Sequence, residues 1–253
     1  MSRTRQTGAP QAAEDRNERP WPAPGPTLRY GLVSLSAATV LVFAIELIFR
    51  GDLAATVDFF LQPFKPGWTT IVLFTLILVT LDALLGRAYQ GLTIVAPLTL
   101  GLAFVGYQKS HYLGDPLFPT DFLYARQIVD LLPLLVRERP LTGLAMAAGL
   151  AGGLLALALV WRALRRRVGA MSYKARFARL ALCLPLLAFF VSIMDYAAFS
   201  WTRDRLQILP MMWDQKENYN SNGFALAFGL NVPRANVSAP PGYSDKAIAA
   251  IAR

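Results

Sequence analysis

Long apolar stretches dominate the pattern of the chain. Five of them are long enough to cross a hydrocarbon layer of about 30 Å, which takes about 20 helical residues. They lie at residues 30–49, 68–85, 91–107, 141–161 and 180–200. A segment in lipid must satisfy its own backbone groups, and the alternation typical of a β-barrel is absent from these stretches. The pattern therefore predicts an all-α integral membrane protein with five transmembrane helices.

The composition agrees with this class and excludes others. Of the 253 residues, 55% are apolar and 16% are charged, whereas soluble domains usually have about 25% charged residues. The single cysteine excludes a disulfide framework and a cysteine-built zinc site. The single histidine excludes a metal site that needs two imidazoles.

Basic residues predict the orientation of the helices. Between the fourth and fifth stretches lie seven basic residues and no acidic one: Arg162, Arg165, Arg166, Arg167, Lys174, Arg176 and Arg179. Positive segments next to a membrane stay in the cytoplasm. Five crossings then place the N-terminus in the cytoplasm and the C-terminus outside, with residues 1–29 as a disordered basic cytoplasmic tail. Because orientation accounts for the charge, we expect no nucleic-acid partner.

Besides the short segment of residues 50–67, two polar segments are predicted to lie outside the membrane. In the first, apolar residues from Asp121 recur with a helical period, which predicts an amphipathic helix over residues 121–132 in the outer interface. The second segment, residues 201–253, contains an Asn222-Gly223 turn signal, followed by Phe224 and Phe228 at i,i+4 spacing. We expect short extracytoplasmic helices there. A last helix is expected from Asp245, and we expect a folded domain to follow it.

Three ionisable residues fall within the predicted transmembrane helices: Glu46, Asp82 and Asp195. Such residues are functional candidates by default. Each also has a structural interpretation in which it pairs with a nearby cation. The cations are Arg50 for Glu46, Arg87 for Asp82, and Arg203 or Arg205 for Asp195.

Other candidate residues have two interpretations each. Asp115 and Asp121 would contact a lipid headgroup or a further domain, or would serve a turn and a helix N-terminus. Small residues recur every four positions on the fourth stretch, at Ala145, Gly149 and Gly153. They favour close helix packing, either within the chain or between copies. His111 is expected as a polar residue of an interfacial loop.

Several motifs together resemble a known family. Outside the membrane they are Trp213-Asp214-Gln215, Asn218-Tyr219, Asn222-Gly223-Phe224, Phe228, Asn231 and Pro241-Gly242-Tyr243-Ser244. This segment resembles the stretch that joins the membrane and catalytic parts of lipoteichoic acid synthases and related phosphoglycerol transferases. The loop Leu113-Gly114-Asp115-Pro116-Leu117 with Pro119-Thr120-Asp121-Phe122 is similar to the outer loop of the same family.

The resemblance implies a function for the complete family architecture. Members transfer phosphoglycerol from phosphatidylglycerol to an acceptor outside the bacterial cytoplasmic (inner) membrane, either a lipoteichoic acid chain or a periplasmic glucan. An extracellular domain of the sulfatase superfamily does this with a threonine nucleophile and a divalent metal such as manganese. This chain departs from the family because its only histidine is His111 and nothing in it replaces that domain. We therefore expect no catalytic residue, metal or cofactor in the chain itself.

The expected function is to anchor a catalytic domain and to present phosphatidylglycerol at the outer leaflet. Residues 201–253 would be the linker towards the missing catalytic domain, and residues 121–132 and 218–228 would form the floor of the lipid site. The expected contacts to the headgroup or the domain are Asp115, Asp121, Arg126, Asn218, Asn222 and Phe224.

Two alternatives remain from the sequence. The chain would be a free-standing, non-catalytic scaffold subunit for a separate catalytic partner chain, or a small transporter-like protein with five spans. A transporter would favour paired polar breaks in inverted halves. The odd number of spans and the lack of internal symmetry argue against the transporter.

Overall fold

The structure, a computed structural model, describes residues 26–61, 66–124, 140–193, 200–208 and 213–235, together with Arg126, Asp130, Pro133 and residues 136–138. Five described helices are long and apolar enough to cross a membrane. They are α1 (Pro26–Arg50), α3 (Pro66–Leu85), α4 (Gln90–Leu113), α6 (Pro140–Arg167) and α7 (Tyr173–Ile193). The predicted class of all-α, multi-pass membrane protein is confirmed.

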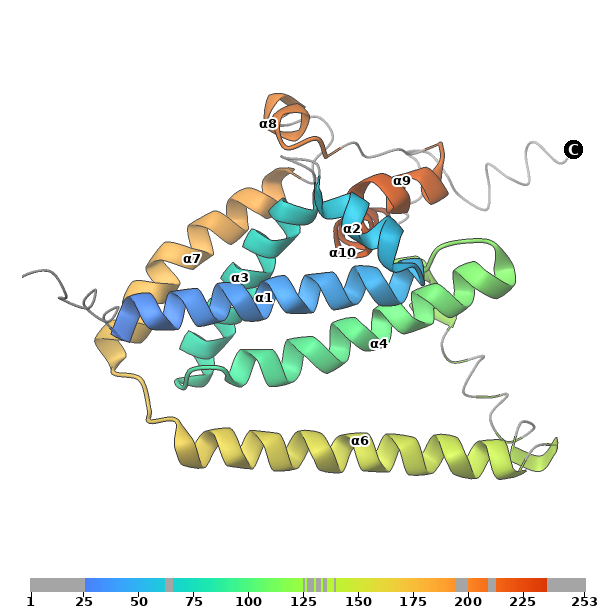
Figure 1. The fold of residues 1–253 in the computed structure, drawn as a ribbon, viewed down its shortest axis with the longest axis horizontal. Coiled ribbons are helices and arrows are strands. Elements are labelled where there is room, and N and C mark those ends of the chain that lie inside the picture. Colours follow the sequence, from blue (N-terminus) through green and yellow to red (C-terminus); the bar gives the residue numbers. More distant parts are fainter. Residues whose placement is uncertain are drawn as a thin grey trace, which may run out of the picture.

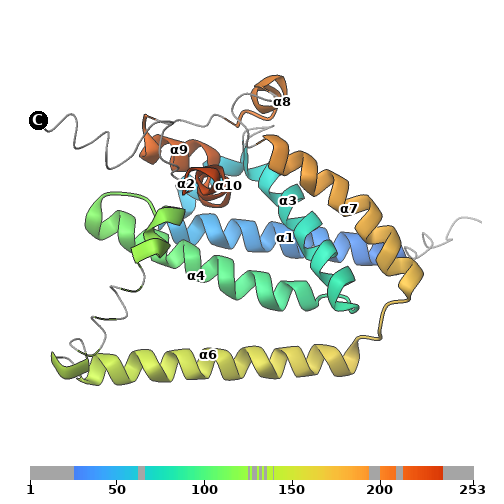
Figure 2. The same cartoon turned by 180° about the vertical axis from the view of Figure 1, so that it is seen from behind.

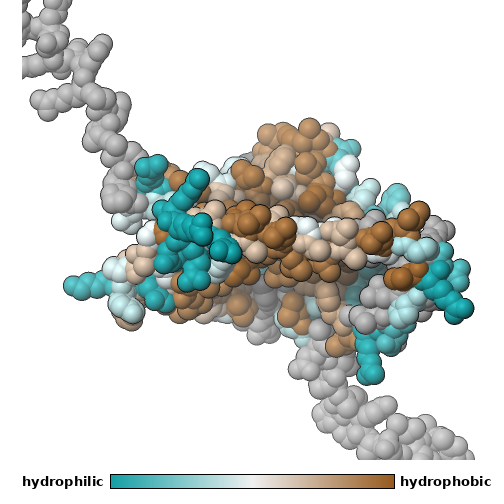
Figure 3. Space-filling model, turned by 90° about the horizontal axis from the view of Figure 1, so that it is seen from below, coloured by the Kyte–Doolittle hydropathy of each residue, from teal (hydrophilic) through white to brown (hydrophobic). Residues whose placement is uncertain are grey.

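Four of these helices form a bundle, and the fifth lies at its side. α1 packs against α3 and α4, and α3 also packs against α7. α6 runs alongside α4 at the edge of the molecule (Figures 1 and 2). The surface is apolar in the middle and hydrophilic towards the two sides (Figure 3), as expected for a protein with a belt of lipid around it. The main buried cluster includes Val42, Ile45, Phe74, Leu78 and Ala103.

Short elements cover one end of the bundle. They are α2 (Leu53–Leu61), the 3₁₀ helices η1 (Pro119–Tyr124) and η2 (Val232–Ala235), α8 (Ser200–Arg205), α9 (Gln215–Asn222) and α10 (Phe224–Asn231). The predicted turn separates α9 from α10, and the rings of Phe224 and Phe228 stack at 5.9 Å. The bundle has two ends, which we name by what lies there. The "α10 end" is where α1 and α4 terminate, and the "arginine end" is where α6 terminates and α7 begins.

Several helix limits differ from the sequence prediction. α4 continues to Leu113, so His111 lies in its last turn and stacks on Tyr107, not in a loop. α7 begins at Tyr173 and not near residue 180. In both cases polar residues form the helix end, so the helix extends beyond the apolar stretch. Asp195 and the helix expected from Asp245 lie outside the described residues, as does half of residues 121–132, whose first four residues belong to a 3₁₀ helix.

Arginine side chains bind the ends of helices at the arginine end. The last carbonyls of a helix have no partner within the helix and carry partial negative charge. Nη1 of Arg87 donates to the carbonyls of Arg165 and Val168, at 2.6 and 2.9 Å, where α6 finishes. Nε of Arg176 donates to the carbonyl of Ala83 at 2.7 Å, where α3 finishes. Basic residues that predict orientation therefore also join the helices to one another.

Asp82 has partners other than the expected one. Its carboxylate accepts hydrogen bonds from the Tyr30 hydroxyl at 2.8 Å and from the backbone N–H groups of Tyr89 and Gly91, at 2.7 and 2.6 Å. The prediction that Arg87 is its partner is wrong, because Arg87 binds carbonyls of α6. The carboxylate instead satisfies the start of α4, where backbone donors lack partners. Asp82 thus connects α1, α3 and α4.

We expect Asp82→Ala to lower the free energy of unfolding by about 3 kcal/mol, because it leaves three donors without an acceptor. Tyr30→Phe removes only one of the three bonds and should cost about 1 kcal/mol. Both values are measured by denaturant titration of the chain in detergent, followed by circular dichroism. An equal loss in the two variants would contradict the role of Asp82 at the start of α4.

Candidate functional site

A buried carboxylate joins α1 to α10. Glu46 lies near the end of α1 and is 1% exposed. One of its oxygens pairs with Nε of Arg50 at 3.1 Å, as their four-residue spacing predicts. The other oxygen accepts the backbone N–H of Phe224 at 2.8 Å. Because the first N–H groups of a helix lack partners and favour a negative charge, Glu46 holds the N-terminus of α10.

Arg50 extends this contact to α9. Its two terminal nitrogens donate to the side-chain and backbone oxygens of Asn220, at 3.1 and 2.7 Å. The guanidinium also lies 4.4 Å from the ring centre of Phe59 in α2. Two residues one turn apart on α1 therefore hold α2, α9 and α10. We call Glu46, Arg50, Asn220 and Phe224 the α1–α10 lock.

Two glycines make the lock possible. Gly223 has φ of +78°, and a Cβ there would lie 2.6 Å from a Glu46 carboxylate oxygen and 2.8 Å from the Phe59 ring. A side chain at this position would therefore strain the backbone and displace the carboxylate. On α4, a Cβ at Gly106 would lie 2.6 Å from the Phe224 ring, so the missing side chain gives that ring its space.

An aromatic cluster surrounds Tyr219 of α9. The residue is 1% exposed, and its hydroxyl donates to the backbone carbonyl of Leu117. Burial raises the pKa of Tyr219 above its ordinary value, and the charge of Asp121 adds to this in the same direction. The neighbouring rings belong to Phe49, Phe118 and Phe224.

The asparagines singled out by the sequence lie inside this assembly. Asn222 and Asn218 are 0% and 1% exposed, and the amide of Asn222 donates to that of Asn218 at 2.7 Å. The Asn218 amide in turn donates to Gln215 at 3.0 Å. Phe224 is also buried. All three are therefore internal in this assembly, and their contact with a headgroup or a further domain stays a prediction.

The acidic residues of the α4–η1 connection have separate surroundings. Asp121 accepts Nζ of Lys109 at 2.6 Å and the backbone N–H of Phe118 at 2.7 Å, which agrees with its interpretation as a helix-start residue. Asp115 is exposed and follows Gly114, which ends α4 with φ of +75°. Arg126 is exposed as well. Of these three residues, Asp121 makes the contacts expected at the start of a helix. Asp115 and Arg126 lie on the surface.

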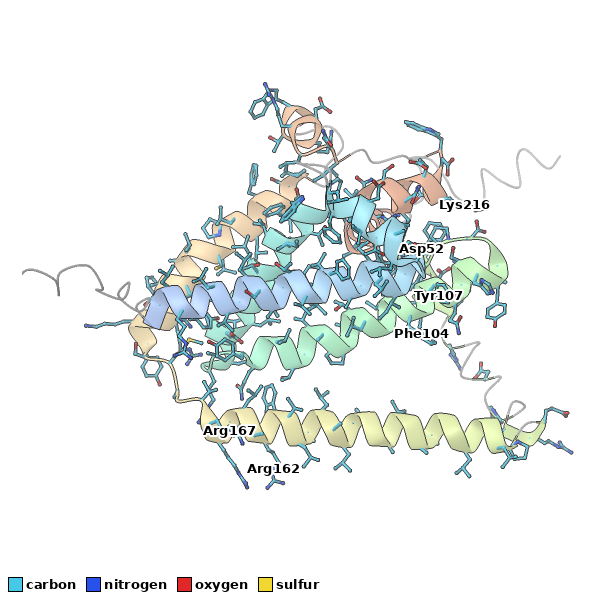
Figure 4. The ribbon with its side chains drawn as sticks, in the orientation of Figure 1. Asp52, Phe104, Tyr107, Arg162, Arg167 and Lys216 are labelled. Carbon is cyan, nitrogen blue, oxygen red and sulfur yellow. The ribbon has the colours of Figure 1, made fainter. Side chains whose placement is uncertain are left out.

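A polar pocket of about 420 Å³ opens beside the lock. Its lining includes Arg50, Ser110, Lys216, Glu217 and Asn220. Lys216 is exposed, and among the described residues no hydrogen bond or ion pair is recorded for its ammonium group. Lys216 and Tyr107 gather at the end of the molecule opposite Arg162 and Arg167 (Figure 4). With a cation, a hydroxyl and carboxylates, this pocket suits a small hydroxylated or phosphorylated group.

The small residues of α6 and the expected lack of a metal site are the remaining predictions. Nothing lies within 4 Å of a Cβ built at Gly149 or Gly153, so the described part of the chain gives this face of α6 no packing partner. The side chain of Ala145 lies outside the described residues. Within the described ranges, no group of three or more His, Cys, Asp and Glu residues is arranged to hold a metal ion.

Sequence reasoning missed three residues of this assembly. Gly106 had a signal, since an isolated glycine inside an apolar helix often marks a close approach. Asn220 and Lys216 had none, because their partners or neighbours in space lie far away along the chain.

Comparison with known proteins gives one informative match. Over 220 residues the chain is 46% identical to a protein of Rhizobium meliloti (strain 1021) that is named as a candidate cyclic beta-1,2-glucan modification protein. The match covers 87% of this chain and 34% of that protein, so the chain spans about a third of the length of this curated relative. No family model and no solved structure matches the chain.

We expect Gly223→Ala to release α9 and α10 from α1, because the new Cβ would meet the Glu46 carboxylate. The measurement is hydrogen–deuterium exchange in detergent, where amides of residues 215–231 should exchange at least about tenfold faster. Gly101→Ala is the matched control, since nothing lies within 4 Å of that position in α4. Unchanged protection of residues 215–231 in Gly223→Ala would show that the lock does not depend on this glycine.

Proposed function

We propose that the chain is the membrane part of a bacterial cell-envelope protein of the phosphoglycerol-transferase type that modifies a periplasmic glucan. Its role is to anchor a catalytic domain and to present phosphatidylglycerol at the outer leaflet. The α1–α10 lock is the observation that carries this proposal. The name of the Rhizobium relative favours a cyclic glucan as the acceptor over a lipoteichoic acid chain.

The lock supports the anchoring role. α9 and α10 follow the last long apolar helix, and Glu46 and Arg50 bind them to the first one. A segment attached at two points to a transmembrane helix has a fixed position relative to the bilayer. Any domain that follows α10 therefore starts from a defined height and direction. A flexible tether would need no buried carboxylate at this position.

Two pockets support the lipid role. The polar pocket beside the lock has Lys216 for a phosphate, while Glu217 and Asn220 are acceptors for glycerol hydroxyls. At the opposite end of α2 lies an apolar pocket of about 620 Å³, lined by Phe60, Trp68 and Phe190 among others. An apolar pocket near a helix end suits an acyl chain. Together they match the two parts of a phospholipid.

The chemistry of transfer belongs elsewhere in this proposal. The divalent metal of related transferases, such as manganese, needs several acidic residues and histidine around it. The described residues of this chain do not fit such a site, because they contain no group of three metal-ligating side chains. The catalytic domain, on the same polypeptide or on a partner chain, would hold the metal and the nucleophile.

The proposal places the chain in the inner membrane with its N-terminus in the cytoplasm. Alkaline phosphatase, which folds only outside the cytoplasm, should be active when fused after Ala235 and inactive when fused after Arg167. A fluorescent protein that matures only in the cytoplasm should give the opposite result at the two sites. Activity of the phosphatase after Arg167 would overturn the orientation.

Deletion of the gene tests the function itself. In the bacterium that encodes the chain, we expect deletion to remove the anionic, glycerophosphate-bearing fraction of the periplasmic glucans. Anion-exchange chromatography and mass spectrometry measure that fraction. The wild-type gene and Gly101→Ala should restore it fully, and Gly223→Ala should restore it in part. Glucans with an unaltered charge profile in the deletion strain would refute the proposal.

A further inference from the structure

A groove between α4 and α6 lies away from the site described above. It has a volume of about 560 Å³ and is lined on α4 by Ile94, Pro97 and Leu98, and on α6 by Leu154, Ala158 and Trp161. The lining is almost entirely apolar. α6 lies beside α4 in both ribbon views (Figures 1 and 2). The groove therefore runs along two helices that are long enough to cross the membrane.

Backbone contacts fix one end of this groove. Arg87, in the turn between α3 and α4, donates to the carbonyls of Arg165 and Val168 where α6 finishes. The N–H of Met171 donates to the carbonyl of Gly86 at 2.8 Å. The end of α6 is thus tied to the turn that starts α4. The spacing of the two helices at the arginine end is set by the fold.

The fixed end of the groove carries positive charge. Arg165 follows Trp161 by four residues, so it continues the groove-lining face of α6 by one turn. Arg167 lies about 200° further round the helix, on the opposite face. Residues 162–179 contain no acid. An anion at the end of the groove would therefore meet Arg165 and no nearby carboxylate of this segment.

A buried donor lies at the same end. Gln90 is 2% exposed, and its Nε2 has no hydrogen-bond partner within the described part of the chain. It precedes Ile94 by four residues, so it lies one turn before the groove-lining residues of α4 and is not itself part of the lining. Gln90 thus marks a polar environment inside α4 at this end, and the proposed phosphate contact is Arg165 alone.

We propose that this groove binds one anionic phospholipid of the leaflet at the arginine end, with an acyl chain between α4 and α6 and the phosphate against Arg165. An apolar groove with a cation at its end complements a ligand that is a hydrocarbon chain with an anionic head. Such ligands surround a membrane helix at high concentration. The site lies at the end of the bundle opposite the α1–α10 lock, and it holds for either orientation of the chain.

Native mass spectrometry of the complete chain in detergent tests the proposal. The probes are dioleoylphosphatidic acid and dioleoylphosphatidylcholine, which share their acyl chains and differ in the charge of the head. The wild type should bind phosphatidic acid more tightly. Arg165→Gln should weaken that binding by about tenfold through loss of a charge-assisted hydrogen bond. Arg167→Gln makes the same charge change on the opposite face and should alter it by less than about twofold.

A second variant tests the groove separately from the charge. Ala158→Phe fills the groove and should weaken the binding of both lipids, while gel filtration confirms that the variant is folded. Equal effects of Arg165→Gln and Arg167→Gln would mean diffuse attraction and would overturn the site. No effect of Ala158→Phe on the binding of either lipid would overturn the proposal. If the wild type forms a dimer in the mass spectrum and this variant loses it with lipid binding unchanged, the groove belongs to a second copy of the chain and the proposal is also overturned.

Discussion

A carboxylate buried near the end of a transmembrane helix is the contact on which the α10 end depends. Removing a charge from water is costly unless its partners are close and well oriented. Glu46 meets this condition from two directions, through the Arg50 guanidinium and the backbone N–H of Phe224. Loss of either partner would leave one oxygen of the buried Glu46 carboxylate unpaired. The first membrane helix and the last described helices therefore form one unit.

The same physical problem is solved at both ends of the bundle. Helix ends present backbone groups without partners, and next to lipid these groups need an acceptor or donor from another helix. Carboxylates serve the helix starts, as Glu46 does for α10 and Asp82 for α4. Arginines serve the helix finishes, as Arg87 does for α6. In the described part of the chain, these polar contacts between helices lie at helix ends, while the main buried cluster packs through apolar side chains.

The sequence predicted what depends on local patterns. Five apolar stretches predicted five long helices, because burial in lipid requires length and low polarity. The Glu46–Arg50 pair followed from its four-residue spacing. The helix limits were less accurate, since α4 and α7 include polar turns that hydropathy assigns to loops.

Contacts between residues far apart along the chain could not be predicted from the sequence. The contacts of Arg50 with Asn220 and of Tyr219 with Leu117 join residues that no local pattern relates. Asp82 shows a different limit: charge pairing favoured Arg87, but the backbone N–H groups of Tyr89 and Gly91 lie closer to the carboxylate. No local pattern showed that Asn218 and Asn222 are buried, with the amide of Asn222 donating to that of Asn218.

The join between Arg87 and α6 tolerates substitutions in that helix. Arg87 binds main-chain oxygens of α6, which every amino acid provides, and it uses no side chain of that helix. Substitutions in the last turn of α6 therefore leave the attachment in place. The position of α6 beside the turn between α3 and α4 thus does not depend on the charge or size of the side chains in its last turn.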